Sequence, residues 1–512
     1  MSSNDLRHAV EPKNKRSNFR YTFTCAILAS TTLIIIGYDI GVLSGASLYI
    51  KQELKITDVQ LEILMGIANP CSLVGSFAAG RTSDWIGRRN TIVLTAVIFV
   101  VAGLLMGFAA NYAMLMAGQF AAGVAGGCAM AIAPVYAAEI SPASLRGFMT
   151  SLPETAVNLG ILLGYLSNYA FAGLPLRLGW RVMLGISAPP SVVLAFMVLG
   201  MPESPRWLVM KGRLAQARAV LEKTCDTAEE VAERLADIKV ASGIPKDLDG
   251  DVVNVHPMGK GGDESRVWRK LVLSPSPAMR RILLSALAIQ FFQQGTGIDA
   301  VVLYNPRVFQ SAGITDTHRL LGVTCAVGAA KMLFTLVAAF LVDRAGRRPL
   351  LLGTTGGMIL SLVGLGVSLT VVDRHPGSKA TWARALCVAS NLALVSFFSA
   401  GLGPIAFVYA AEIFPLRERA LGAALGAAMN RVAAGVVTMT FLSLSRAITI
   451  GGTFFLYAGI TALAWVFFFT YLPETRGRTL EEMGKLFGMT TGAVMDDNDD
   501  AGKQNAVEMP AK

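Results

Sequence analysis

Long runs of apolar residues, separated by short polar links, make up most of this 512-residue chain. A helix that crosses about 30 Å of hydrocarbon needs roughly 20 predominantly apolar residues. Twelve runs meet this requirement, beginning near Tyr21, Leu61, Thr91, Ala113, Phe148, Val182, Ile282, Leu320, Leu350, Ala385, Ala420 and Thr453. Six of them precede a long polar segment and six follow it. The pattern predicts an all-α integral membrane protein with 12 transmembrane helices in a six-plus-six arrangement.

The same pattern divides the chain into five parts. These are an N-terminal tail (1–20), a first six-helix half (21–201), a polar linker (202–281), a second six-helix half (282–472) and a C-terminal tail (473–512). In the linker, Trp207–Leu221 and Ala228–Ala241 have the apolar spacing of short amphipathic helices. Residues 242–265 are rich in Gly, Asp and Pro, which predicts a flexible link. The polar tail after Leu486 is predicted to be disordered.

Three polar signatures recur in the same order in the two halves. DWIGRR (84–89) returns as DRAGRR (343–348), YAAEISP (136–142) as YAAEIFP (409–415), and PES (202–204) as PET (473–475). The acidic residues of the three pairs are separated by 259 (343 − 84), 273 (412 − 139) and 271 (474 − 203) residues. Repeats at nearly constant spacing predict two homologous, pseudo-symmetric halves, which are typical of secondary transporters.

Composition agrees with a protein that resides in a bilayer. Apolar residues make up 53% of the chain, charged residues 16%, and the mean hydropathy is +0.52. The formal net charge of +10 would suit a nucleic-acid ligand, but the basic residues flank the apolar runs, so we expect no nucleic-acid partner. An even number of spans places both termini on one side of the membrane, and the positive-inside rule makes that side cytosolic.

The sequence carries no recognisable catalytic machinery. It contains no nucleophile–base pair, nucleotide motif or cluster of metal ligands, so we expect neither an enzyme nor a bound metal or cofactor. Five of the six cysteines fall inside apolar runs, where thiols behave as small hydrophobic groups rather than disulfide partners. The polar, basic N-terminus lacks the apolar region of a signal peptide, so no cleaved signal is expected.

Glycine and proline are frequent inside the predicted spans. Small residues let helices approach one another closely, and this packing role explains most of them. Two groups, Gly295-Thr-Gly297 and Gly401-Leu-Gly-Pro404, can also unwind a helix beside a substrate cavity. Both interpretations stay open at this point.

Eight segments together resemble the sugar porter family of the major facilitator superfamily. They are GYDIGVLSG (37–45), GRTSDWIGRR (80–89), PVYAAEISPASLRG (134–147), PESPRWL (202–208), QQGTGID (293–299), DRAGRR (343–348), YAAEIFP (409–415) and PETRGRTLEEM (473–483). The resemblance covers roughly residues 20–485. Within the family the chain is most similar to plant polyol and monosaccharide transporters, through LYNPRVF (303–309), SLPETAVNLGILLGYLSNY (151–169) and FLSLSRAITIGGTFFLYAGI (441–460).

The resemblance implies the major facilitator fold and transport by alternating access, in which the two halves rock around a central site. It also implies that charged residues of the repeated signatures form cytosolic networks that latch the halves together in the outward-facing state. These gate residues are Asp84, Arg88, Glu139, Arg146, Glu203, Asp343, Arg347, Glu412, Arg417 and Glu474. The alternative interpretation is simple membrane-flanking charge.

Asp39 is the predicted proton-coupling residue, because a charged group at mid-span is costly and is a functional candidate by default. In proton-driven sugar porters the matching aspartate takes up the coupling proton, and an arginine that follows a glycine at the start of the fourth span serves it. The matching positions here are Gly118 and Gln119, so that arginine is absent. Coupling is therefore weakened, lost or carried by other groups. A structural, hydrogen-bonding aspartate is the other interpretation.

The resemblance also implies a set of substrate-binding residues: Glu154, Gln293, Gln294, Asp299, Phe407 and Asn430. Polyhydroxylated ligands need converging donors and acceptors beside an apolar surface, which these residue types supply. Glu154 and Asp299 stand where Gln and Asn are usual and favour ligands rich in hydroxyl donors, such as linear polyols. The glutamine pair can instead bridge helices, and Phe407, where Trp is common, can be a packing residue. Lys331, inside the eighth span, has no transferable role.

From these observations we predict a secondary active transporter that moves polyols or monosaccharides by alternating access with proton symport. A proton is the expected coupling ion. The alternatives are a proton-independent facilitator, which Gln119 favours, and a non-transporting sugar sensor. The expected partners are a small polyol or monosaccharide and the lipid bilayer, while the oligomeric state is undetermined. The predicted location is the plasma membrane, with both termini cytosolic.

Overall fold

A computed structural model describes residues 15–141, 146–225, 227–242, 275–375, 381–414 and 418–474, together with the single residues 244, 268, 271 and 273. Within these ranges the secondary structure is helical and contains no strand. Residues 1–14 of the N-terminal tail and all of the C-terminal tail except Pro473 and Glu474 lie outside the described residues. The predicted flexible link at 242–265 also lies outside them, apart from residues 242 and 244.

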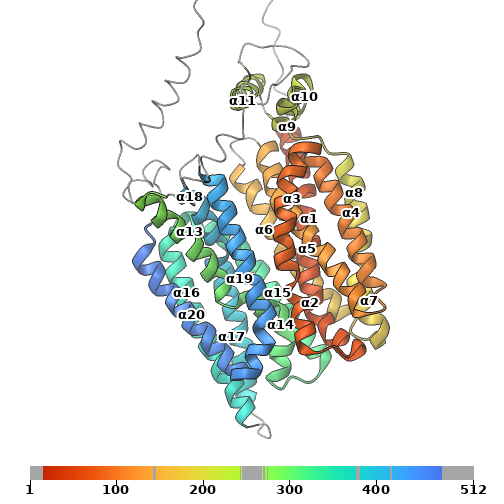
Figure 1. The fold of residues 1–512 in the computed structure, drawn as a ribbon, viewed down its shortest axis with the longest axis vertical. Coiled ribbons are helices and arrows are strands. Elements are labelled where there is room, and N and C mark those ends of the chain that lie inside the picture. Colours follow the sequence, from red (N-terminus) through yellow and green to blue (C-terminus); the bar gives the residue numbers. More distant parts are fainter. Residues whose placement is uncertain are drawn as a thin grey trace, which may run out of the picture.

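The first six membrane crossings use eight helices, because two crossings are broken (Figure 1). They are α1 (Lys15–Leu54), α2 (Asp58–Gly66) with α3 (Ala68–Ile86), α4 (Arg88–Gly107), α5 (Tyr112–Ile140), α6 (Arg146–Ala170), and α7 (Leu176–Gly185) with α8 (Ala188–Leu199). Every crossing contains the start that the apolar pattern predicted for it. This half is called the N-half below.

The second six crossings follow the same plan. They are α13 (Pro277–Gly295) with α14 (Ile298–Ser311), α15 (Thr317–Ala345), α16 (Arg347–Arg374), α17 (Thr381–Ala400) with α18 (Leu402–Ile413), α19 (Arg419–Ile448) and α20 (Ile450–Tyr471). They form the C-half, which lies beside the N-half in Figure 1. The predicted twelve-helix fold is confirmed. Ten of the crossings are long and apolar enough by themselves to span a bilayer.

The remaining two crossings, α6 and the α13–α14 pair, are more polar than the others. They are the crossings on which the sequence placed Glu154, the glutamine pair and Asp299. Between α13 and α14 the chain turns through Gly297, whose φ of +81° lies in the left-handed region that favours glycine. The break between α17 and α18 falls at Gly401. Both glycine groups therefore interrupt their helices.

Three short helices of the linker lie at one end of the bundle, which we call the linker end; the opposite end is the distal end (Figure 1). They are α9 (Pro205–Met210), α10 (Leu214–Thr224) and α11 (Ala228–Ala241). The apolar pattern suggested one helix over Trp207–Leu221, but Gly212, with φ +74°, divides it into α9 and α10. The three helices share a small apolar core.

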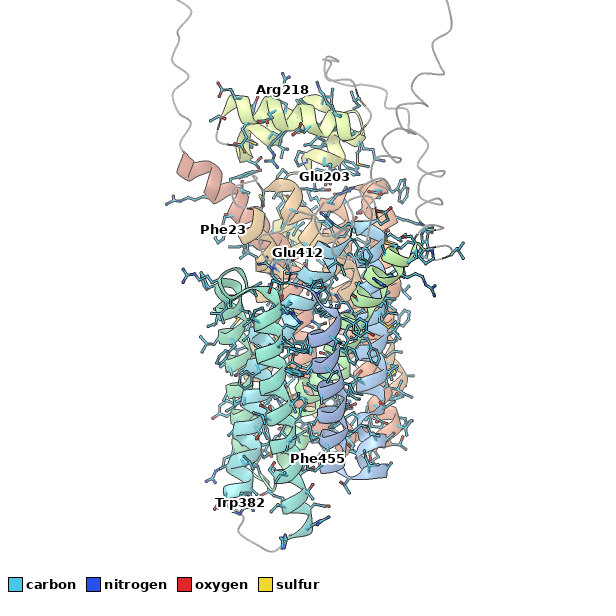
Figure 2. All side chains as sticks on the ribbon, turned by 90° about the vertical axis from the view of Figure 1, so that its left-hand side faces the viewer. Phe23, Glu203, Arg218, Trp382, Glu412 and Phe455 are labelled. Carbon is cyan, nitrogen blue, oxygen red and sulfur yellow. The ribbon has the colours of Figure 1, made fainter. Side chains whose placement is uncertain are left out.

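The linker helices are fastened to the N-half. The indole of Trp207 donates a hydrogen bond to the carbonyl of Asp84 at 3.2 Å, and the guanidinium of Arg234 donates one to the carbonyl of Ser141 at 2.9 Å. In Figure 2 Glu203 lies where this group meets the bundle, and Arg218 lies farther out. The linker helices and the N-half therefore form one unit at this end.

A very close helix contact in the N-half joins α1 and α6. Glycines on both helices face the backbone of the other: Gly37 and Gly41 face Val157 and Ile161, while Gly160 and Gly164 face Ile34 and Tyr38. A Cβ built on Gly164 would lie only 2.6 Å from the carbonyl oxygen of Tyr38. Only glycine permits this approach, as the small-residue interpretation predicts.

Candidate substrate cavity and gates

A cavity of about 160 Å³ lies between the two halves. Its polar lining comes from seven helices: Asp39 of α1, Asn69 and Ser72 of α3, Gln119 of α5, Gln294 of α13, Asp299 of α14, Lys331 of α15 and Arg431 of α19. Apolar side chains such as Phe99 and Ile161 complete the wall. Convergent polar groups on an apolar wall are the usual features of a small-molecule site.

The structure brings Asp39 and Gln119 into contact. The amide nitrogen of Gln119 donates a hydrogen bond to the Asp39 carboxylate at 3.3 Å, and both side chains are buried. Within the described residues Asp39 forms no ion pair, and an amide stands where the resemblance implies a cation. The side-chain oxygen of Gln119 has no hydrogen-bond partner in the same part of the chain.

The two glutamines of α13 have different surroundings. Gln293 donates to the carbonyl of Gly403 at 2.7 Å and accepts from Asn430, so it ties α13 to α18 and α19. Gln294 donates to Asn430 at 3.2 Å, and its own oxygen, at the cavity, has no partner among the described residues. Gln290, one turn earlier, accepts from Asn430 at 3.0 Å. Both glutamines therefore bridge helices, and only the side-chain oxygen of Gln294 is also available to a ligand.

Glu154 of α6 lies beside the cavity without lining it, and it interacts electrostatically with Lys331. Lys331 also interacts electrostatically with Asp299, and Asp299 interacts with Arg431.

Phe407, 41% exposed, is neither packed in the core nor part of the cavity wall. Sequence reasoning missed Arg431, although a guanidinium in the middle of an apolar run was a visible signal.

The repeated GRR signature builds a capped helix start in the N-half. Gly87 ends α3 with φ +101°, and the carboxylate of Glu203 accepts the backbone N–H groups of Arg88 (2.8 Å) and Arg89 (3.2 Å) at the start of α4. An anion at this position satisfies free donors and the positive end of the helix dipole. Arg88 also pairs with Asp84 at 3.0 Å and with Glu139 at 3.3 Å.

The C-half repeats this geometry. Gly346 has φ +91°, and Glu474 accepts the backbone N–H groups of Arg347 and Arg348, each at 3.0 Å, at the start of α16. Arg347 pairs with Glu412 at 3.2 Å. In Figure 2 Glu203 and Glu412 both lie towards the linker end. The similar networks explain in physical terms why the same residue types recur at one spacing.

A second set of charges, which the sequence did not single out, joins the halves at the distal end. Asp58 of α2 forms ion pairs with Lys51, with Arg446 of α19 and, at 3.7 Å, with Arg307 of α14. Glu62, one turn later and 1% exposed, accepts hydrogen bonds from the backbone N–H of Ser443 at 2.7 Å and from its hydroxyl at 2.5 Å. The halves are therefore held together at this end.

Comparison with known proteins decides the family. The model of the family described as "Sugar (and other) transporter" matches residues 25–487. The chain belongs to this family. It is accordingly a transporter and not an enzyme, and the expected sugar porter fold is confirmed.

Several members of the sugar transporter family are similar over nearly their whole length. Putative polyol transporter 1 of Arabidopsis thaliana is 57% identical over 95% of this chain and 94% of its own. Polyol transporter 5 of the same plant is 56% identical (92% and 87%), and the glucose transporter GlcP of Staphylococcus epidermidis is 32% identical (91% and 97%). The expected similarity to plant polyol transporters is confirmed.

Solved structures of the xylose transporter XylE are also similar. The proton:xylose symporter bound to 6-bromo-6-deoxy-D-glucose is 25% identical with a TM-score of 0.72, and the alignment covers 92% of this chain and all of that one. The inward-open form from E. coli, also 25% identical, gives a TM-score of 0.74 over 91% of this chain and all of that one.

The gate residues of this sugar transporter lie in two networks, one in each half. Asp84, Arg88, Glu139 and Glu203 meet in the N-half, and Arg347, Glu412 and Glu474 in the C-half. Arg417 and the side chains of Arg146 and Asp343 lie outside the described residues. The contacts given above run within each half, so a latch between the halves stays a prediction.

Gly87→Ala is expected to destabilise the N-half network. Alanine is strained at a φ of +101°, which costs about 1–3 kcal/mol, and its methyl group would also clash with the Glu203 carboxylate. We expect a melting temperature several degrees lower for the purified protein, with Gly346→Ala showing a similar loss. Gly353→Ala, where the added methyl meets open space, is the matched control. Equal melting temperatures for Gly87→Ala and this control would contradict the role of Gly87.

Proposed function

We propose that this protein carries polyols and monosaccharides across the membrane by alternating access, coupled to the movement of protons. The observation that supports this most directly is the cavity to which α1 and α5 of the N-half and α13, α14, α15 and α19 of the C-half each contribute a polar side chain. A site shared by two rocking halves changes its exposure when they move. The polyol transporters among the relatives point to the same class of substrate.

The chemistry of the cavity suits a hydroxyl-rich ligand. The side-chain oxygens of Gln119 and Gln294 are buried acceptors without partners in the described part of the chain, and an unsatisfied buried acceptor costs about 1–3 kcal/mol. Hydroxyl donors of a polyol would satisfy both oxygens. Lys331 and Arg431 supply donors, and Asp299 a further acceptor, for the remaining hydroxyl groups.

Asp39 is the proposed proton site, because it is a buried carboxyl group on the cavity wall. Its contact with Gln119 rather than with a cation favours one other function, proton-independent facilitation. We place the carrier in the plasma membrane on the basis of the family resemblance. The basic residues that flank the spans favour the linker end and both termini in the cytosol.

Uptake of labelled sorbitol and glucose, in cells that lack their own carriers, tests the proposal. We expect accumulation above equilibrium that is greater at pH 5.5 than at pH 7.5 and is abolished by a protonophore. Asp39→Asn is expected to reduce accumulation at least tenfold while leaving the protein at the cell surface. Gly459→Ala, with open space around the added methyl group, is the control for expression.

Two results would change the conclusion. Uptake that reaches equilibrium only, and is unaffected by pH, protonophore and Asp39→Asn, would make the protein a facilitator. No uptake of any polyol or sugar by protein confirmed at the surface would exclude the transport of these substrates and favour a sensor.

A further inference from the structure

Besides Asp39, four charged side chains lie at the cavity or beside it, and the proposed function uses none of these four for coupling. They come from four different helices: Glu154 from α6, Asp299 from α14, Lys331 from α15 and Arg431 from α19. Glu154 belongs to the N-half and the other three to the C-half. A bilayer interior makes isolated charges expensive, so four in one place require an explanation.

These charges compensate one another through space rather than by contact. Asn158 of α6 donates a hydrogen bond to the Thr335 hydroxyl of α15 at 3.0 Å, and Glu154 and Lys331 lie one turn away from this contact on the same two helices. Lys331 interacts electrostatically with Asp299 and with Glu154, and Arg431 interacts with Asp299. No direct ion pair and no side-chain hydrogen bond joins any of the four to another residue within the described part of the chain. Their donors and acceptors are therefore unused, and three of the four groups face the cavity.

The four charges sum to zero, with two acids and two cations, and Asp39, which also lines the cavity, adds no charge while it carries the coupled proton. A proton that passes from Lys331 to Glu154 neutralises both groups at once, so the sum of the charges stays at zero. Charge balance is thus independent of where such a proton resides. A ligand with its own net charge would unbalance the site, and it would also lose its hydration on entering a small cavity of low dielectric constant.

We propose that Glu154, Asp299, Lys331 and Arg431 form a charge-balanced ring that determines substrate specificity, admitting uncharged polyols and sugars and excluding sugar acids and amino sugars. The proposal rests on the proposed function, because it names what the same cavity accepts. It also gives a role to Lys331 and Arg431. An uncharged ligand can bridge the cations and acids with its hydroxyl groups, each of which both donates and accepts.

Substitutions that change the net charge of the ring test this role in opposite directions. Glu154→Gln leaves one excess positive charge and is expected to admit a carboxylate ligand, for which gluconate is the probe. Lys331→Met leaves one excess negative charge and is expected to admit protonated glucosamine at pH 6. In Glu154→Gln the affinity for gluconate relative to sorbitol should rise at least tenfold. In Lys331→Met the same rise is expected for glucosamine relative to glucose.

The double variant Glu154→Gln/Lys331→Met is the matched control. It restores a balanced ring with one acid and one cation, so it should again reject both charged ligands. If the two substitutions only damaged the structure, the double variant would instead show the defects of both single variants together. Affinities are measured on purified protein by ligand-induced thermal stabilisation, so that a variant unable to transport is still informative.

The outcomes separate this proposal from the transport function itself. If the wild-type protein binds sorbitol or glucose but neither ratio moves by more than twofold in the single variants, the charged ring does not set specificity and the proposed function stands. The ring would be overturned equally if one single variant raised its affinity for gluconate and for glucosamine alike, because an excess charge of one sign must favour only the ligand of opposite charge. If the wild-type protein binds neither sorbitol nor glucose, the proposed function fails and this inference fails with it.

Discussion

Gly160→Val is expected to abolish accumulation of the folded protein. Gly160 lies where α6 crosses α1, and even a single added carbon there would clash with the carbonyl oxygen of Ile34 and approach Tyr38 N to 2.8 Å. Both neighbours are backbone atoms of a helix, so neither can move aside as a flexible side chain would. Overpacking costs about 1–3 kcal/mol when side chains can adjust, and more is expected here. Against a typical stability of about 5–15 kcal/mol this is a large fraction.

The measurement is the yield and melting temperature of the protein in detergent, followed by size-exclusion chromatography. Gly160→Ala should show the same defect in milder form. Gly353→Ala and Gly459→Ala, on α16 and α20, meet nothing within 4 Å and should be as stable as wild type or slightly more so. A Gly160→Val protein that melts at the wild-type temperature would show that α1 and α6 can separate without loss.

Glu62→Ala is expected to open the distal end. The carboxylate accepts two hydrogen bonds from Ser443 across the boundary between the halves and is 1% exposed. Removing one partner of a buried, charged hydrogen-bonding group costs about 2–5 kcal/mol. The closed-to-open ratio should therefore fall by at least about thirtyfold. The substitution acts directly on the equilibrium between the closed and the open distal end, because these hydrogen bonds exist only while the halves meet there.

Spin labels at Val59 of α2 and Ile448 of α19, two exposed positions at the distal end, report the change as a longer distance population. Ser443→Ala should show a smaller shift, because the backbone N–H remains. Ser445→Ala removes a hydroxyl that bonds only within its own helix to Leu442, and it should leave the distances unchanged. Identical distance distributions for Glu62→Ala and wild type would mean that Asp58 and its three cations hold this end closed by themselves.

The fold was predictable from the sequence because its signals are local. Apolar runs of sufficient length define the crossings, and glycine at 297 and 401 marks where two of them break. The gate signatures were visible as repeats. Their geometry was not, because the bond between Glu203 and the start of α4 joins residues more than a hundred positions apart. Spacing identified the residues, whereas tertiary packing decided which atoms they meet.

The cavity was predicted only in part for a similar reason. Gln293 and Gln294 are neighbours in sequence, and the rotation of α13 alone decides that the second faces the cavity and the first faces α18. Glu62 reads in the sequence as an ordinary charge near a helix start. Its partner Ser443 lies 381 positions away, on the other half, so no local pattern connects them. Roles that depend on such pairs become visible only in the structure.

The attached linker helices form a projection that is rigidly bound to the N-half. Trp207 and Arg234 bond to Asp84 and Ser141, and Glu203 caps α4, so α9 to α11 must travel with that half. An antibody fragment bound to α10 and α11 would enlarge the moving body without touching the cavity. In single-particle imaging, the angle between this bound fragment and the C-half would report the rocking motion in individual molecules.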